Sequence, residues 1–92
     1  MIISFIDKDT EELFHTERNT RFSQISRVAV RKLTALHAAE VLTDLLVPPG
    51  NRLEALKGKG AGWQSIRVND QWRIIFRWTA KGPSDVAITD YH

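Results

Sequence analysis

Residues 63–78, WQSIRVNDQWRIIFRW, alternate apolar and polar side chains on both sides of a short polar break. Alternation with a period of two is typical of β-strands that bury one face and expose the other. The break, Asn69-Asp70-Gln71, predicts a hairpin loop between two antiparallel strands, 63–68 and 72–78. One face of this hairpin then faces a core, and the other face carries arginines.

The length of the loop determines which residues pair across the hairpin. A three-residue loop at 69–71 pairs Val68 with Trp72 and places Arg67 opposite Arg73, whereas a two-residue loop pairs Arg67 with Trp72. Like charges directly opposite each other destabilise a sheet. Such a pair is tolerated most readily where an anion binds, and a phosphate matches two guanidinium groups well. The alternative is two exposed arginines splayed into water.

The flanks of the hairpin also predict β-structure. Arg52–Leu56 predicts a short strand, and the glycine-rich Gly58–Gly62 (GKGAG) predicts a flexible connection. This connection is not a phosphate-binding P-loop, because it has no GK[ST] ending and no helix follows it. A final strand is predicted from about Asp85, after a turn at Lys81-Gly82-Pro83.

The N-terminal half predicts one strand and two helices. Apolar Met1–Ile6 predicts the strand, and Asp7 is placed to cap a helix over 8–15. Ser23 is predicted to cap a longer helix, which Pro48-Pro49-Gly50 ends. The apolar stripe of that helix has three-and-four spacing: Ile25, Ala29, Leu33, Leu36, Ala39, Leu42 and Leu45.

The element order β-α-α-β-β-β-β predicts an α+β fold of one domain, 1–92, with two N-terminal helices packed against a small, antiparallel-rich sheet. Hydrophobic residues at 42% and charged residues at 26% argue against disorder. The absence of cysteine excludes disulfides and thiolate metal sites and fits a reducing compartment. The opening MIISFIDKDTEE shows neither a signal peptide nor a membrane span, so we expect a cytoplasmic protein that does not bind membranes.

Positive charge is concentrated in the C-terminal half. Residues 52–82 contain seven Lys and Arg against two acids, whereas residues 1–46 contain six against seven. A basic half suggests a polyanion such as nucleic acid, and the alternative is a set of solvated cations at strand edges. His15 and His37 fall on the predicted helices as surface or packing residues, and no spacing resembles a metal site, so no metal or other cofactor is expected.

The terminal run DVAITDYH, 85–92, closes with an acid, a phenol and an imidazole: Asp90, Tyr91 and His92. Taken alone, these three residues are explained by a packed tyrosine flanked by two exposed polar side chains. In a regular strand Tyr91 faces away from both neighbours, so the three converge on one point only if the strand twists or frays.

Together, RLEALKG (52–58), SIRVNDQWRIIFRW (65–78), DVAITDYH and the opening IISFIDKDTEELF resemble the HigB branch of the RelE-like toxins, over essentially the whole chain. The resemblance implies the RelE-like fold and a toxin of a type II toxin–antitoxin system. It implies that the protein enters the A site of the small ribosomal subunit and cleaves messenger RNA there during translation, without a cofactor. It also implies a HigA-type helix-turn-helix antitoxin as partner, with operator DNA bound only through the toxin–antitoxin complex.

The resemblance also assigns site residues by position. The catalytic set is Lys57, Arg67, Arg73, Asp90, Tyr91 and His92. Glu54 stands where some relatives have a functional histidine and others, like this chain, a glutamate. Lys59 and Arg77 are expected to add positive charge for RNA binding.

These residue types suit metal-free RNA cleavage, in which a ribose 2′-hydroxyl attacks the neighbouring phosphate. Arg67 and Arg73, with Lys57, would stabilise the dianionic phosphorane. His92 titrates near neutral pH and can serve as base or acid, and Asp90 could orient it or act as the base itself.

The phenol of Tyr91 is a poor base at a free pKa of about 10 and more plausibly stacks on a nucleobase or hydrogen-bonds the phosphate.

Two other functions remain as alternatives. ParE-type relatives share the fold but are non-enzymatic inhibitors of DNA gyrase, and they are not expected to combine paired arginines with a terminal Asp-Tyr-His. A degenerate relative that only binds an antitoxin is the other alternative. A generic DNA-binding module is disfavoured, because no recognition-helix pattern with clustered basic residues occurs.

Overall fold

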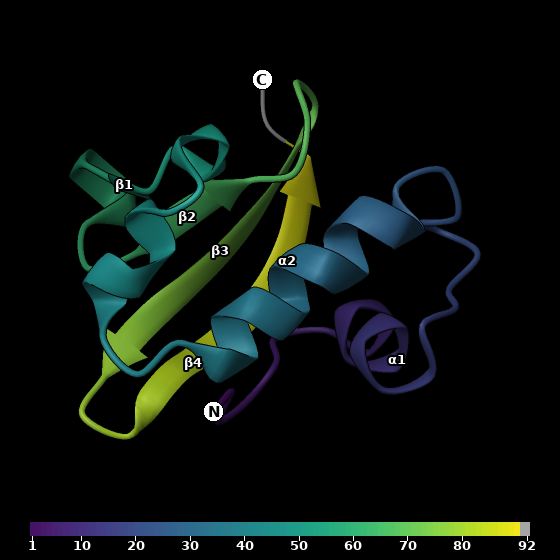
Figure 1. The fold of residues 1–92 in the computed structure, drawn as a ribbon, viewed down its shortest axis with the longest axis horizontal. Helices are drawn as coiled ribbons and strands as arrows, with labels where there is room; N and C mark the ends of the chain where they lie inside the picture. The colour runs from purple at the N-terminus through teal and green to yellow at the C-terminus, as the bar shows by residue number, and fades with distance from the viewer. Residues whose placement is uncertain (91–92) are drawn as a thin grey trace.

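Two helices pack against a four-stranded antiparallel sheet (Figure 1). The computed structural model describes residues 1–90. The elements are α1 (Lys8–Thr16), α2 (Ser26–Ala38), the 3-10 turns η1 (Leu42–Leu46) and η2 (Pro49–Asn51), strand β1 (Glu54–Ala55), the 3-10 turn η3 (Gly58–Gly60), and strands β2 (Gln64–Arg67), β3 (Trp72–Thr79) and β4 (Gly82–Asp90). The strands pair in the order β1-β2-β3-β4. The predicted α+β fold is therefore confirmed.

The β2–β3 hairpin has the register predicted for a three-residue loop. Arg67 pairs with Arg73, and the N–H of Val68 donates to the carbonyl oxygen of Trp72 at 2.9 Å. The side-chain oxygen of Asn69 accepts two backbone N–H groups from the far side of the loop, at 2.9 and 2.8 Å. Side-chain acceptance of this kind stabilises a tight turn, so the loop fixes the pairing of both strands.

The apolar face of the hairpin meets the helices in a hydrophobic core. Phe22, in the segment between the helices, packs edge-on against Trp72 with ring centroids 5.6 Å apart. Burying one such side chain fully stabilises the fold by about 1.5–3 kcal/mol. The completely buried side chains include Leu13, Leu33 and Leu36 from the helices and Ile66, Ile74, Phe76 and Val86 from the sheet.

Helix α1 begins as predicted, with Asp7 as its N-cap. The Asp7 carboxylate accepts the backbone N–H and the hydroxyl of Thr10 at 2.9 and 2.8 Å. The same hydroxyl oxygen accepts the N–H of Ile88, on β4, at 3.1 Å. Because Thr10 is completely buried, water cannot replace these bonds, and the first turn of α1 is tied directly to the sheet.

The prediction that Ser23 caps the second helix is wrong. Residues 21–25 form turns, and the helix begins at Ser26. The residue at the cap position is Ile25, which makes no side-chain cap hydrogen bond. The side chain of Ser23 therefore lies outside the helix start that its sequence position suggested.

The same helix also ends earlier than its apolar stripe predicts. It stops at Ala38, and Leu42–Leu46 forms the separate turn η1. The carboxylate of Asp44 accepts the backbone N–H groups of residues 40 and 41 at 2.9 and 3.2 Å, which starts that turn. Leu45 is nevertheless only 1% exposed. The apolar stripe therefore identified core residues both in α2 and beyond its end, but it did not predict where the helix ends.

Residues 1–6 do not form the predicted first strand. They make one isolated parallel bridge to β4, between Phe5 and Val86, and the N–H of Ile6 donates to the carbonyl oxygen of Val86 at 2.9 Å. Asp85 has a φ of 53°, outside the extended region. Asp85 lies directly before the bridged residue Val86, so the β4 backbone departs from a regular strand where the N-terminal segment meets it.

Strand β4 begins at Gly82 and not near Asp85 as predicted, because pairing with β3 continues to Thr79. Gly82 has a φ of 130°, and a Cβ there would collide with the backbone oxygen of Met1. Only glycine lets the N-terminal segment lie this close to the start of β4.

Replacing Thr10 with valine should lower the free energy of unfolding by about 1–3 kcal/mol, because the Ile88 N–H would be buried without an acceptor. Urea denaturation followed by circular dichroism measures this. Thr34→Val is the matched control, since the exposed hydroxyl of Thr34 donates only to Val30 within α2. Equal effects of the two substitutions would show that Thr10 does not tie α1 to the sheet.

Candidate functional site

The two predicted phosphate-binding arginines are paired on adjacent strands. Arg67 on β2 lies directly opposite Arg73 on β3. Because side chains alternate along a strand, both project from the side opposite to their completely buried neighbours Ile66 and Ile74. The register of the hairpin thus places two arginines side by side on one face of the sheet.

Arg73 is buried, with only 6% of its surface exposed. Its Nε donates to the hydroxyl oxygen of Ser65 at 3.0 Å, and one terminal nitrogen donates to the carbonyl oxygen of Arg52 at 2.8 Å. Two bonds from different nitrogens fix the plane of a guanidinium group. The alternative of two arginines splayed into water is therefore wrong for Arg73.

Arg67 is less enclosed, with 31% of its side chain exposed. A terminal nitrogen lies 2.5 Å from a carboxylate oxygen of Asp70, whose side chain is 99% exposed. Surface ion pairs of this kind contribute little to stability and are screened by salt. Arg67 can therefore exchange this partner for another anion at small cost.

Asp90 is the last described residue of β4 and lies opposite Trp72. Its carboxylate accepts the side-chain N–H of Gln71 at 3.2 Å. The hairpin loop thus contacts both Arg67, through Asp70, and Asp90, through Gln71. β2 and β4 are separated by two strand spacings, or about 10 Å.

Tyr91 and His92 lie outside the described residues, so their predicted roles stay predictions.

Residues that contact the arginines were missed by the sequence analysis. Ser65 could have been found, since it precedes Arg67 by two positions and so shares its face. The carbonyl oxygen of Arg52 could not have been found in this way, because every residue has a backbone carbonyl and the sequence does not indicate which one accepts from Arg73.

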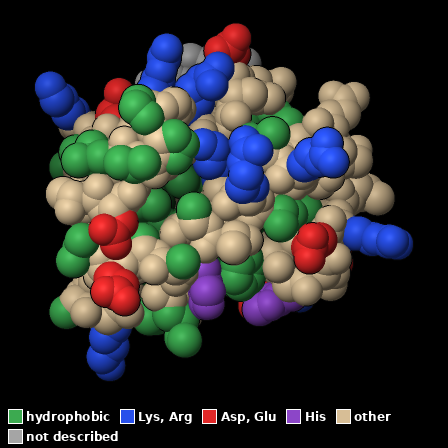
Figure 2. Space-filling model, viewed as in Figure 1, with side chains coloured by type: hydrophobic (Ala, Val, Ile, Leu, Met, Phe, Trp, Pro, Cys, Tyr) green, Lys and Arg blue, Asp and Glu red, His purple; other side chains and the backbone are tan. Residues whose placement is uncertain are grey.

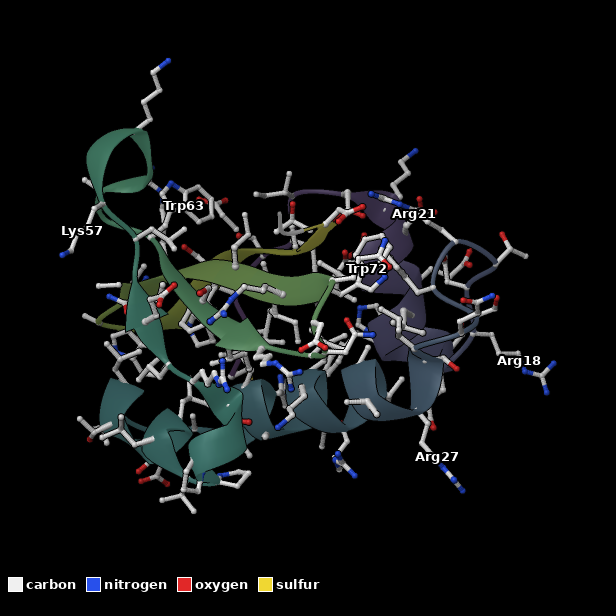
Figure 3. All side chains as sticks on the ribbon, turned by 90° about the horizontal axis from the view of Figure 1, so that it is seen from above. Arg18, Arg21, Arg27, Lys57, Trp63 and Trp72 are labelled. Carbon is white, nitrogen blue, oxygen red and sulfur yellow. The ribbon has the colours of Figure 1, made fainter. Side chains whose placement is uncertain are left out.

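Glu54 and Lys57 come from β1 and the turn after it. Glu54 pairs with Ser65, the residue that orients Arg73. Glu54 and Lys57 line a hollow of about 500 Å³, together with Ala55, Leu56 and Gly60. In Figure 3, Lys57 lies on the same side of the molecule as Trp63, and Trp72 lies well apart from it, toward Arg21.

The two residues predicted to bind RNA differ in their surroundings. Lys59 is exposed in η3. The guanidinium carbon of Arg77 lies 4.6 Å from the centre of the Trp63 ring, and its Nε lies 3.8 Å from a carboxylate oxygen of Asp85. A cation–π contact and an ion pair already account for the position of Arg77.

The helix histidines have local packing partners. The ring of His37 lies 5.1 Å from that of Phe14, and its Nδ1 accepts the N–H of Ile2 at 3.1 Å. His15 packs beside the same phenylalanine, with ring centroids 5.3 Å apart.

Within residues 1–90, no three His, Asp or Glu side chains lie close enough to hold a metal ion. None of the helices in that range is long and apolar enough to span a membrane.

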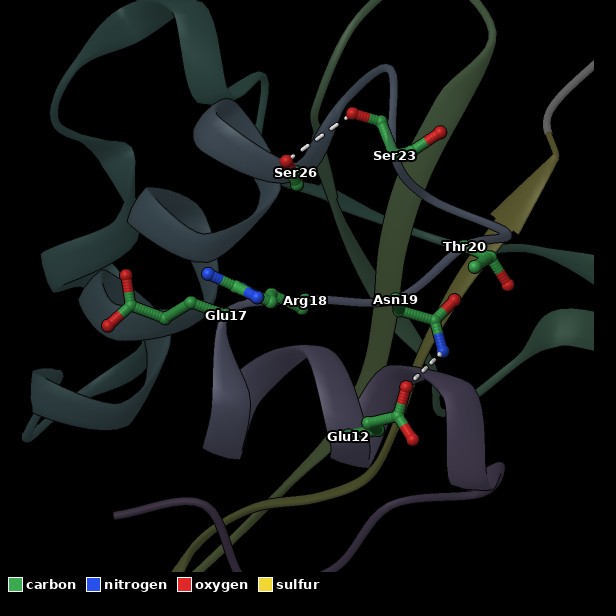
Figure 4. Close-up of a pocket in the computed structure, with 7 residues that line it drawn as sticks. All are labelled: Glu12, Glu17, Arg18, Asn19, Thr20, Ser23 and Ser26. Carbon is green, nitrogen blue, oxygen red and sulfur yellow. Dashed lines mark hydrogen bonds between the residues drawn. The ribbon is translucent and has the colours of Figure 1, made fainter.

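Two other hollows lie beside the α1–α2 connection. One, of about 340 Å³, contains none of the predicted site residues (Figure 4) and is lined by Glu12, Glu17, Arg18, Asn19, Thr20, Ser23 and Ser26. Asn19 bonds Glu12 at 3.1 Å within it. The other, of about 260 Å³, reaches the hairpin loop at Gln71 and Trp72 and so lies next to Asp90.

The face that carries α2 is rich in positive charge. Figure 2 shows Lys and Arg side chains gathered along α2 and toward the strands beside it. Helix α2 contains Arg27, Arg31 and Lys32, and the positive charge of Arg67 on β2 acts on Lys32. Charge thus extends from the paired arginines onto a helix that the sequence analysis treated only as a packing element.

The fold matches those of known toxins. A solved YoeB–YefM complex from Staphylococcus aureus contains a chain with a TM-score of 0.62 at 20% identity, covering 100% of this chain and 98% of that one. The YoeB/ParE toxin from Agrobacterium tumefaciens gives 0.52 at 17% identity, covering 99% and 98%. At such identities the match concerns the fold alone, which is the RelE-like toxin fold.

Sequence comparison gives the family. Residues 3–92 match the family described as the RelE-like toxin of type II toxin–antitoxin system HigB. The chain is 45% identical over 80 residues to Toxin HigB-1 of Vibrio cholerae serotype O1, covering 85% of this chain and 84% of that protein. It is 43% identical over 56 residues to an uncharacterized protein of Haemophilus influenzae, covering 61% and 55%. The chain belongs to the HigB family of type II toxins, which act with an antitoxin partner.

The burial of Arg73 predicts which contact of the paired arginines matters for stability. Ser65→Ala should lower the free energy of unfolding by about 1–3 kcal/mol, since it leaves a buried charged donor without its acceptor. Asp70→Ala should leave stability unchanged within error, although its contact with Arg67 is shorter, because that pair is exposed. Urea denaturation of both variants decides this, and a larger effect of Asp70→Ala would contradict it.

Proposed function

We propose that this toxin is a ribosome-dependent endoribonuclease that cleaves translated messenger RNA in the A site of the small ribosomal subunit, by metal-free acid–base catalysis. The single observation that carries the proposal is the pair of arginines on β2 and β3, with Arg73 oriented by Ser65 and by the Arg52 carbonyl. A donor that is oriented before the substrate arrives, as Arg73 is, suits the stabilisation of a developing phosphorane. Family membership supports the same function.

The chemistry follows from the phosphate that the arginines would bind. The 2′-oxygen of the ribose attacks phosphorus and loses its proton to a base. The bond from phosphorus to the 5′-oxygen then breaks, and an acid protonates that oxygen. The products are a 2′,3′-cyclic phosphate and a 5′-hydroxyl end. Arg67 and Arg73 would hold the non-bridging oxygens, and Lys57 would approach from the exposed edge at β1.

Proton transfer is assigned to the C-terminal residues 90–92. His92 is proposed as base or acid, because an imidazole exchanges protons near neutral pH. Asp90 would orient it or act as the base, and Tyr91 would contact the phosphate or stack on a nucleobase. Glu54 lies on β1, the strand at the other edge of the sheet from β4, where it pairs with Ser65, and is proposed only as a supplementary charge on that side. Lys59 and Arg77 are proposed to attract the RNA backbone.

Dependence on the ribosome has a physical reason in the shape of the site. The proposed residues extend across four strands, or about 15 Å, and the described hollows among them are open to solvent. Such a surface offers few groups that could hold a flexible RNA in the geometry of in-line attack. The decoding site would supply this positioning, which is worth many orders of magnitude in effective concentration.

The proposed partners are a helix-turn-helix antitoxin of the HigA type, the small ribosomal subunit and messenger RNA. Operator DNA would be contacted by the antitoxin, and by the toxin only through the complex. The proposed place of action is the cytoplasm, where translation occurs.

Arg73→Lys and His92→Ala should each lower cleavage on translating ribosomes by about 10²–10³-fold, the usual cost of removing one charge-stabilising or proton-transferring group. Lysine keeps the charge of Arg73 but cannot make both of its orienting bonds. The measurement is 5′-end mapping of messenger RNA after brief induction, with ends phosphorylated by a kinase before ligation. Lys81→Ala, at the exposed β3–β4 turn, is the control and should cleave like the wild type.

Outcomes of that mapping also separate the alternative functions. Growth arrest without new ends inside reading frames would overturn the nuclease proposal and favour inhibition of gyrase. Absence of both arrest and new ends would favour a relative that only binds an antitoxin.

The purified toxin should cleave a message programmed in the A site at least about 10³-fold faster than the same RNA free in solution, because positioning is supplied by the ribosome. Single-turnover rates on the two substrates, at equal concentration and salt, measure the ratio. Rapid and unselective degradation of free RNA would contradict ribosome dependence.

A further inference from the structure

A buried lysine lies on α2 and is not among the residues that the sequence analysis selected. Only 9% of Lys32 is exposed, and its ammonium group donates a short hydrogen bond to the side-chain oxygen of Asn51 in η2. Lysine is among the residues least often buried. A buried lysine that bonds a neutral amide therefore needs a reason.

Asn51 is held rigidly in this position. It is 1% exposed, and its amide nitrogen donates to the carbonyl oxygens of Leu45 and Val47 at 3.1 and 3.4 Å. With its nitrogen used in this way, its oxygen is oriented toward Lys32. The lysine thus connects α2 to the turn that leads into β1.

The next residue contacts the candidate site. Arg52 adopts the left-handed conformation, with φ 47° and ψ 54°, which costs a non-glycine residue about 1 kcal/mol or more. In this conformation its carbonyl oxygen accepts the terminal nitrogen of Arg73 at 2.8 Å. A chain of contacts therefore runs from Lys32 through Asn51 and Arg52 to the guanidinium of Arg73.

The electrostatic surroundings of Lys32 are unfavourable. Burial, followed by the positive charges of Arg31 and Arg67, lowers the pKa of Lys32 below its usual 10.5. An unfavourably placed charge of this kind is commonly replaceable by an apolar side chain of similar shape without loss of stability. Features that break local stability rules tend to occur at functional sites.

We propose that Lys32 is a positioning residue, which acts through Asn51 to hold the Arg52 carbonyl and thereby sets the orientation of Arg73. The importance of that orientation for RNA cleavage rests on the proposed function. The orientation itself does not, because it is a property of the free protein. Without the ammonium group, the turn at 51–52 loses its hydrogen bond to α2, and the Arg52 carbonyl that accepts from Arg73 is no longer held in place.

The variant that tests this is Lys32→Met, which keeps an unbranched side chain only one heavy atom shorter and removes the donor. Arg31→Met is the matched control, since it removes the same charge from the neighbouring position, but the exposed Arg31 has no role in the contact chain. The first measurement is the Arg73 Nε–H signal in ¹H–¹⁵N NMR, with its hydrogen-exchange rate. We expect the signal to shift and to exchange at least about tenfold faster in Lys32→Met, and to stay unchanged in Arg31→Met.

The second measurement is cleavage on programmed ribosomes. We expect kcat to fall about 10–100-fold in Lys32→Met with KM within about twofold of the wild type, because misorientation affects the reacting geometry and not the encounter. Arg31→Met should raise KM, if it changes anything, and leave kcat alone. If Lys32→Met does not fold, Lys32→Leu, which also lacks a donor, replaces it, with the same direction of change expected in the Arg73 signal.

An unchanged Arg73 signal in the folded Lys32 variant would overturn the proposal, and so would an equal loss of kcat in Arg31→Met. If wild-type protein fails to cleave on ribosomes, the proposed function is wrong. The NMR comparison still decides the positioning role in that case.

Discussion

The pairing of β2 with β3 is the constraint on which the other features of this toxin depend. Side chains alternate along a strand, so a slip of one residue would bring Arg73 into the core and expose Ile74. The bond from Val68 to Trp72 and the side-chain oxygen of Asn69 prevent such a slip. One short loop therefore decides both which residues form the core and which cations face one another.

The paired arginines illustrate two ways of holding a cation. Arg73 is fixed by a hydroxyl and a backbone carbonyl inside the protein, so its direction is set when the chain folds. Arg67 is bonded to an exposed aspartate in the loop, and that bond is weakened by salt and by competing anions. Arg73 can therefore orient a bound anion in one direction, while Arg67 can adjust its position to the anion that binds.

Some local signals in the sequence predicted local structure correctly, whereas the Ser23 cap did not. The three-residue loop and the Asp7 cap were correct because each depends on a few neighbouring residues. The helical stripe was right about burial and wrong about the helix after Ala38, since periodicity marks the side that faces the core and not the continuity of the backbone. The Arg52 carbonyl and the burial of Lys32 depend on contacts between distant segments, which no pattern within one segment contains.

The contacts between the N-terminal segment and β4 join residues that are far apart in the chain. Ile6 bonds Val86, and Thr10 bonds Ile88, across sequence separations of about 80 residues. Contacts of such high order form late and require most of the chain to be available. During synthesis, α1 can therefore pack against the sheet only after β4 has left the ribosome. A nascent chain that ends before β4 lacks the strand on which α1 and the N-terminal segment pack. Premature termination therefore leaves the sheet incomplete and α1 without its contacts to β4.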